Sequence, residues 1–89
     1  MTRITDKQLD AIADRLNKIT NSPLKPYIDG KAQVGNYHIS HAYGGVCLHR
    51  MHNEGGGVSS PLSCGHVTKR ELASMLYAFI AGINSTMEA

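Results

Sequence analysis

Two short cysteine–histidine pairs carry the side chains in this sequence that are most suited to chemistry. Cys47 and His49 are separated by one residue, and so are Cys64 and His66. A thiol beside an imidazole can act as an activated nucleophile when a third group orients the base. No known nucleophile motif surrounds either cysteine, so we expect no catalytic residues and no enzyme activity.

The same two pairs could supply two thiolates and two imidazoles to a zinc ion. Structural zinc sites usually place about two to four residues between the ligands of each arm, whereas each pair here is separated by one residue. An antiparallel or looped arrangement could still join the pairs, but we expect ordinary thiols and polar histidines, with no metal and no cofactor. Two cysteines are too few for a disulfide scaffold, which indicates a reducing compartment.

A run of three glycines is the most suggestive indication of ligand binding. Gly55, Gly56 and Gly57 could aim several backbone N–H groups into one concavity, which can hold an anion. The start of the second expected helix would add a positive dipole and two basic side chains. The run lacks the lysine and serine of a P-loop and does not match the dinucleotide-binding fingerprint. The residues expected to contact a ligand or partner are Tyr43, His49, Arg50, His52, Gly55, Gly56, Gly57, Ser59, Lys69 and Arg70.

Two amphipathic helices are expected to position these residues. The first spans about residues 5–20 and begins with a capping box formed by Thr5 and Gln8. The second spans about residues 68–83 and begins with a similar box at Thr68. Their apolar faces consist of Leu9, Ile12, Ala13 and Leu16 in the first helix and Leu72, Met75, Leu76, Phe79, Ile80 and Ile83 in the second.

Between the helices, about residues 31–60 are expected to form a small antiparallel sheet. Gly44 and Gly45 are predicted to be the two central residues of a hairpin turn, because glycine tolerates positive φ angles. This turn would pair Tyr43 with Val46. The face expected to pack on the helices carries Tyr37, Ile39, His41, Tyr43, Val46, Leu48, Arg50 and His52. The more polar face, expected to be solvated or to form a site, carries His38, Ser40, Ala42, Cys47, His49 and Met51.

This order of elements predicts an α+β fold, with residues 1–89 as a single domain. A sheet of two or three strands is marginal alone, so both helices are expected to cover one of its faces. A sheet continued across a homodimer would also satisfy its open edges. The wide apolar stripe of the second helix likewise favours self-association, so we expect a homo-oligomer.

The hairpin resembles a stretch found in small uncharacterised proteins of tailed phages and prophages. The residues that carry this resemblance are Asn36-Tyr37-His38-Ile39-Ser40-His41-Ala42-Tyr43-Gly44-Gly45-Val46-Cys47-Leu48-His49-Arg50-Met51. In that group a tyrosine-bearing strand, a glycine turn and an apolar-basic strand are followed by a glycine-rich segment and a helix. The resemblance covers roughly residues 33–83, implies a phage origin and an accessory role, and transfers no chemistry.

Composition narrows the classes of function. The chain has 89 residues, of which 18% are charged, and a net charge of +2, which is unlike a dedicated duplex-DNA-binding protein. It contains no apolar run long enough to span a membrane and no signal peptide at its start, so we expect the host cytoplasm.

Together these features predict a non-enzymatic phage-encoded binding protein. It would occupy or sequester a host factor or a small anionic or nucleotide ligand, in antagonism of host antiviral defence. The alternative expectations are a single-stranded nucleic-acid-binding accessory protein, with Tyr37, Tyr43 and Arg50 facing unpaired bases, or a phage assembly protein.

Overall fold

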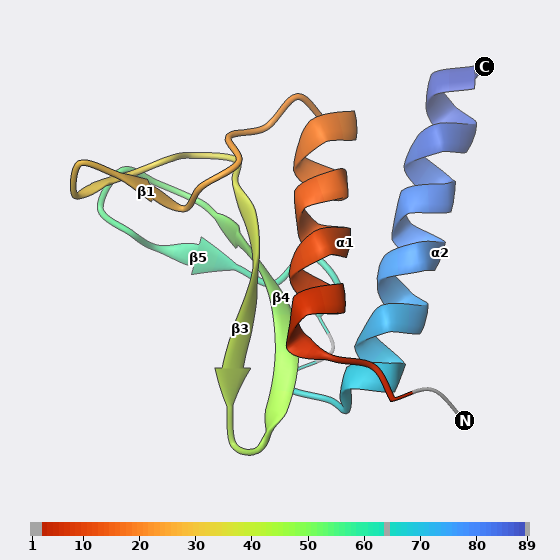
Figure 1. The fold of residues 1–89 in the computed structure, drawn as a ribbon. Helices are drawn as coiled ribbons and strands as arrows, with labels where there is room; N and C mark the ends of the chain where they lie inside the picture. The colour runs from red at the N-terminus through yellow and green to blue at the C-terminus, as the bar shows by residue number, and fades with distance from the viewer. Residues whose placement is uncertain (1–2, 64, 89) are drawn as a thin grey trace.

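The computed structural model describes residues 3–63 and 65–88 and has an α+β fold. Two helices lie side by side over one face of a small antiparallel sheet, and a second, two-stranded ribbon extends from the far end of that sheet (Figure 1). The elements are α1 (Asp6–Ile19), β1 (Tyr27–Ile28), β2 (Lys31–Ala32), β3 (Tyr37–Ala42), β4 (Gly45–Met51), β5 (Val58–Ser59) and α2 (Lys69–Glu88). The larger sheet has the order β3-β4-β5, and β1 pairs with β2.

Both helices begin as the sequence predicts. The Thr5 hydroxyl accepts a hydrogen bond from the Gln8 amide at 3.1 Å, and the Gln8 side chain accepts one from the Thr5 amide at 2.8 Å. At the start of α2, the Thr68 hydroxyl accepts from the Glu71 amide at 3.1 Å. The expected end of α2 near residue 83 is wrong, because the helix continues to Glu88. A glycine within it, Gly82, faces open space and keeps a helical backbone.

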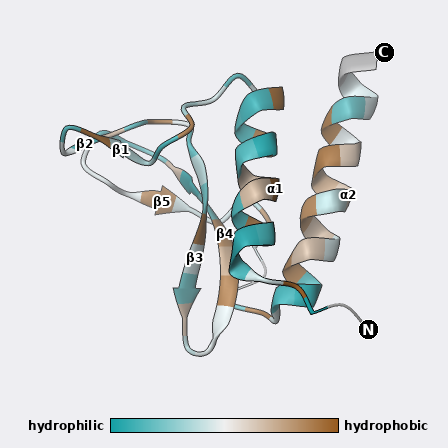
Figure 2. Ribbon diagram, viewed as in Figure 1, coloured by the Kyte–Doolittle hydropathy of each residue, from teal (hydrophilic) through white to brown (hydrophobic). Residues whose placement is uncertain are grey.

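The apolar residues of both helices and of one sheet face form the core. Leu9, Leu16, Leu48, Leu72 and Leu76 are fully buried. The side of α1 seen in Figure 2 is largely hydrophilic, whereas α2 is mostly apolar or neutral. In the described part of the chain, no helix is long and apolar enough to cross a membrane.

The β3–β4 turn lies one residue earlier than expected. Tyr43 and Gly44 are its central residues, with φ angles of 54° and 74°, and Ala42 pairs with Gly45. The predicted pairing of Tyr43 with Val46 is therefore wrong, and His41 is the partner of Val46. Because side chains alternate with a period of two, this two-residue change in register leaves each strand residue on its predicted face.

Gly45 is needed for a close approach rather than for a turn. A Cβ atom at this position would lie 2.9 Å from the carbonyl oxygen of Val67. That segment joins β4 through two backbone hydrogen bonds between Val46 and Val67, both of 2.8 Å. The absence of a side chain at Gly45 thus allows the chain before α2 to pack against the hairpin.

The polar face of the hairpin is only partly solvated. Cys47 and Met51 are buried, which corrects the expectation for these two residues, because this face was predicted to be solvated or to form a site. His38, Ser40 and His49 are half-buried on the same face.

The helix-facing side of the hairpin carries buried Tyr37, as predicted. The prediction that Tyr43 also packs on the helices is wrong, because Tyr43 is a turn residue and is 98% exposed. His41, Arg50 and His52, which were predicted on the same side, are exposed as well.

Asn17 ties α1 to the edge of the sheet. Its side-chain amide donates to the Tyr37 carbonyl at 2.9 Å, and its carbonyl oxygen accepts from the Tyr37 amide at 2.7 Å. Both groups are buried, so this one side chain satisfies backbone groups that a neighbouring strand would otherwise bind. The α1–β3 packing is therefore fixed by hydrogen bonds as well as by apolar contacts.

Candidate functional site

Tyr43 occupies the tip of the β3–β4 hairpin, and 98% of its surface is exposed. Its φ of 54° lies in the left-handed region, where side chains other than Asn, Asp and Gly are disfavoured. The β1–β2 turn has a similar backbone conformation, because Asp29 and Gly30 adopt φ angles of 52° and 76°. Asp is a residue type that this conformation favours, whereas tyrosine is disfavoured there, so the backbone conformation does not favour a tyrosine at this position.

Three histidines extend from this tip along the sheet surface that faces away from the helices; we call His38, His49 and His66 the histidine face. His38 and His49 are direct cross-strand partners whose ring centroids lie 5.9 Å apart. The His49 and His66 rings are 6.1 Å apart, and the His66 and Tyr43 rings are 5.9 Å apart. All these contacts are edge-to-face, so the four rings form a continuous row.

Hydrogen bonds from polar neighbours hold the row in place. The buried Asn36 side chain donates to the Pro23 carbonyl at 2.8 Å, which leaves its oxygen to accept from His38 Nδ1 at 3.1 Å. His66 Nε2 and the Ser40 hydroxyl lie 3.3 Å apart, which links the segment before α2 to β3. Two of the four rings, those of His38 and His66, are therefore held by hydrogen bonds.

Burial keeps two of the imidazoles neutral. Desolvation lowers the pKa of His38, and the neighbouring His49 lowers it further. Desolvation also lowers the pKa of His49, with a smaller effect in the same direction from His66. Both rings are consequently uncharged at pH 7, when they present hydrogen-bonding nitrogens and ring edges rather than positive charge.

The structure describes one of the two cysteine–histidine pairs in full. Cys47 is buried, and its thiol donates to the Leu48 carbonyl at 3.4 Å. Cys64 lies outside the described residues. Among residues 3–63 and 65–88, no group of three or more His, Cys, Asp or Glu side chains is arranged to hold a metal ion.

The glycine run does not present an open ring of backbone donors, which corrects the sequence prediction. The amides of Gly55 and Gly57 both donate to the side-chain oxygen of Asn53, each at 3.0 Å. The Gly56 amide donates to the Asn53 backbone carbonyl at 3.2 Å. Asn53 therefore occupies the position that an anion was expected to take, and the sequence pattern alone did not identify this residue.

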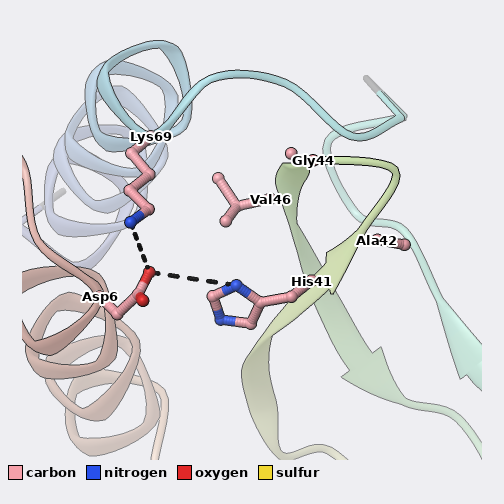
Figure 3. A pocket seen from close by; sticks show the side chains of 7 residues that line it. Asp6, His41, Ala42, Gly44, Val46 and Lys69 are labelled. Atoms are coloured by element: carbon pink, nitrogen blue, oxygen red, sulfur yellow. Dashed lines mark ion pairs between the residues drawn. The ribbon is translucent and has the colours of Figure 1, made fainter.

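The positive charge at the start of α2 is also partly neutralised. Lys69 forms an ion pair with Asp6 at 3.1 Å, and His41 Nδ1 lies 4.0 Å from the same carboxylate oxygen (Figure 3). These residues line a hollow of about 400 Å³ beside Gly44. Arg70 is exposed on the next position of the helix.

The ten predicted contact residues therefore occupy different regions of the molecule. Tyr43 and Lys69 lie at the tip end of β4, and His49 lies on the histidine face. The glycine run follows the opposite end of β4 (Figure 1). At that opposite end, three predicted residues do come together around one hollow: Arg50, His52 and Ser59.

Comparison with known proteins adds no family to this description. No protein-family model matches the chain. No curated protein and no solved structure matches it either. What the protein does is therefore inferred from the geometry of its own residues.

Proposed function

We propose that this chain is a non-enzymatic, phage-encoded protein that captures a host protein with the tip of its β3–β4 hairpin. The observation that carries the proposal is Tyr43, which is 98% exposed and has a left-handed backbone conformation. A rigid, exposed aromatic side chain is a common anchor in protein interfaces, because it buries a large area at a small cost in side-chain entropy.

The shape of the tip favours a protein as the partner. Tyr43 is a central residue of a two-residue turn and is almost fully exposed, whereas the pockets that bind small molecules enclose most of the ligand surface. A partner with an apolar pocket and a hydrogen-bond acceptor for the phenol would match this side chain. The histidine face lies directly behind the tip, and it would form the polar rim of the same interface.

The charge of the histidine face favours a protein over a nucleic acid. His38 and His49 are neutral at pH 7 because burial lowers their pKa values. Two neutral imidazoles give little attraction to phosphates, which dominate nucleic-acid affinity. Tyr37, a side chain expected to face unpaired bases in the alternative function, is buried in the core.

In this proposal the protein acts by binding alone. Binding at a functional surface of the host protein would block that surface without any chemical step. This mode of action agrees with the accessory role implied by the resemblance of the hairpin to phage proteins, including antagonism of a host defence protein.

Affinity capture with matched tyrosine variants tests the proposal. Tagged wild-type protein, Tyr43→Asn and Tyr77→Gln are each incubated with bacterial lysate, and retained proteins are quantified by mass spectrometry. Tyr77 is the control because its side chain is also exposed but lies on α2. We expect one host protein to be retained stoichiometrically by the wild type and by Tyr77→Gln, and to be lost with Tyr43→Asn. Equal retention by all three proteins would contradict the proposal.

A further inference from the structure

A small hollow lies at the end of β4 that is remote from the hairpin tip. Its volume is about 250 Å³, and it is lined by Val34, Gly35, Arg50, Met51, His52 and Ser59. The lining contains an arginine, a histidine and a serine, but no acidic side chain. All three polar side chains can donate hydrogen bonds.

Arg50 is held in place at this hollow by an aromatic ring. Its guanidinium carbon lies 5.1 Å from the centroid of the Tyr37 ring. Tyr37 is itself buried and packs edge-to-face on Phe79, with a centroid distance of 6.1 Å. A cation stacked on a fixed ring loses less freedom when it binds a ligand than a free side chain does.

Gly35 and the lack of an acidic partner leave the guanidinium accessible. A Cβ atom at Gly35 would lie 3.9 Å from Arg50 Nη2, so a longer side chain there would crowd it. Among the residues that the structure describes, the ion pairs involve Asp6 with His41 or Lys69 and do not include Arg50. Its charge is therefore available to an external anion.

The sheet register places a serine directly opposite Arg50. Arg50 and Ser59 are direct cross-strand partners in β4 and β5, so their side chains lie on the same face. His52 follows β4, and its backbone amide donates to the Gly57 carbonyl at 2.8 Å, which fixes the start of the β4–β5 loop. Arg50, His52 and Ser59, which come from β4, the loop after it and β5, thus line the same hollow.

We propose that the Arg50–His52–Ser59 hollow binds a phosphate group. The guanidinium offers two parallel N–H donors to a phosphate, which is the geometry of strong arginine–phosphate pairs. The Ser59 hydroxyl and the His52 ring would donate to the remaining oxygens. This site is separate from the hairpin tip and goes beyond the proposed capture of a host protein.

Nuclear magnetic resonance titration of the full chain tests this site. Inorganic phosphate is added at constant ionic strength and pH 7, and the backbone amides and the Arg50 Nε–H are followed. We expect saturable shifts centred on Arg50, His52 and Ser59. Arg50→Gln is expected to weaken binding at least tenfold, and Ser59→Ala a few fold.

The control is Arg15→Gln, which removes an exposed arginine from α1 and is expected to leave phosphate affinity unchanged. If Arg50→Gln fails to fold, Arg50→Lys and Ser59→Ala serve instead, because each retains a side chain at its position. A parallel titration with adenosine monophosphate distinguishes the source of the phosphate: tighter binding identifies a nucleotide, and equal binding identifies phosphate alone. Unsaturable shifts spread over all basic residues, or unchanged affinity in Arg50→Gln, would overturn the proposal.

Discussion

At the scale of single residues, Tyr43 combines two features that are each unfavourable for an isolated protein. It exposes almost its whole side chain to water, and it adopts a backbone conformation that tyrosine disfavours. In the Asp29-Gly30 turn, which has similar φ angles, the chain uses a residue type that this conformation favours. The proposed contact with a host protein would explain a tyrosine at the tip.

Replacing Tyr43 with Asn is therefore expected to stabilise the protein. Asparagine adopts the left-handed conformation at little cost, so the free energy of unfolding should rise by about 1 kcal/mol and the Tm by about 4–8 °C. Thermal unfolding followed by circular dichroism measures this change. A fall in Tm would show that the Tyr43–His66 ring contact supports the fold and that Tyr43 is a structural residue.

The histidine face makes stability depend on pH. The folded pKa values of His38 and His49 lie below their ordinary value of 6.5, so the folded protein binds fewer protons than the unfolded chain. The contribution of these two histidines to stability is then fully present above pH 6.5. It is lost as the pH falls from 6.5 through the lowered pKa values of the folded protein. Urea unfolding at pH 8 and pH 5 should show a lower midpoint at pH 5.

The double variant His38→Gln and His49→Gln provides the control for this pH dependence. Glutamine keeps a polar side chain but does not titrate, so the difference between the two midpoints should shrink. An unchanged difference would assign the acid sensitivity to other groups.

The hydrogen-bonding roles of two asparagines could not be predicted from the sequence pattern. Asn17 is a polar residue one turn after Ala13 on the buried side of α1, and Asn53 precedes a glycine run. Their roles depend on backbone groups that only the folded chain brings near: the Tyr37 peptide for Asn17, and the Gly55 and Gly57 amides for Asn53.

At the scale of elements, α1 is joined to β3 by the Asn17 side chain. Asn17→Ala leaves a buried N–H and a buried C=O of Tyr37 without partners, which should cost about 2–4 kcal/mol of stability. Urea unfolding measures the loss, and Asp14→Ala on the exposed side of the same helix should change stability by less than about 0.5 kcal/mol. Equal effects of both changes would mean that the Asn17 bonds add nothing.

The segment before α2 is joined to the hairpin by the close approach at Gly45. Gly45→Ala places a methyl group 2.9 Å from the Val67 carbonyl oxygen and should destabilise the fold by about 1–3 kcal/mol. Gly82→Ala adds the same methyl group to open space on α2 and should stabilise the fold by about 0.5–1 kcal/mol. Thermal unfolding of both variants checks these opposite signs, and two shifts of the same sign would contradict the packing described.

The helix starts, the α+β order and the two faces of the hairpin could be predicted because capping and hydrophobic periodicity are local in sequence. The turn position could not be predicted, because two adjacent glycines favour a turn centred on Gly44 and Gly45, whereas the turn is centred on Tyr43 and Gly44. Gly45 is instead needed beside the Val67 carbonyl, which packs against it from a segment far along the chain.

At the scale of the whole molecule, β4 separates two candidate surfaces. The hairpin tip and Tyr43 lie at its start, and the Arg50 hollow lies at its end (Figure 1). The sequence pattern identified residues at both ends of β4 but predicted that they form one site. Closeness in sequence does not show that a strand separates them.

The two surfaces are expected to act independently. Distant sites without shared partners usually contribute additively. Tyr43→Asn should therefore leave phosphate affinity unchanged, and Arg50→Gln should leave the capture of the host protein unchanged. Titration calorimetry of each variant with phosphate, together with affinity capture, checks this separation; coupling in either direction would contradict it.

Photo-crosslinking at the hairpin tip tests the central claim most directly. The photoreactive residue p-benzoylphenylalanine replaces Tyr43 in one protein and Tyr77 in another, and both are irradiated in bacterial cells. We expect a single defined crosslinked product from position 43 that contains one host protein, and no such product from position 77. The same product from position 77, or no product from position 43, would contradict the claim that the hairpin tip is the contact surface.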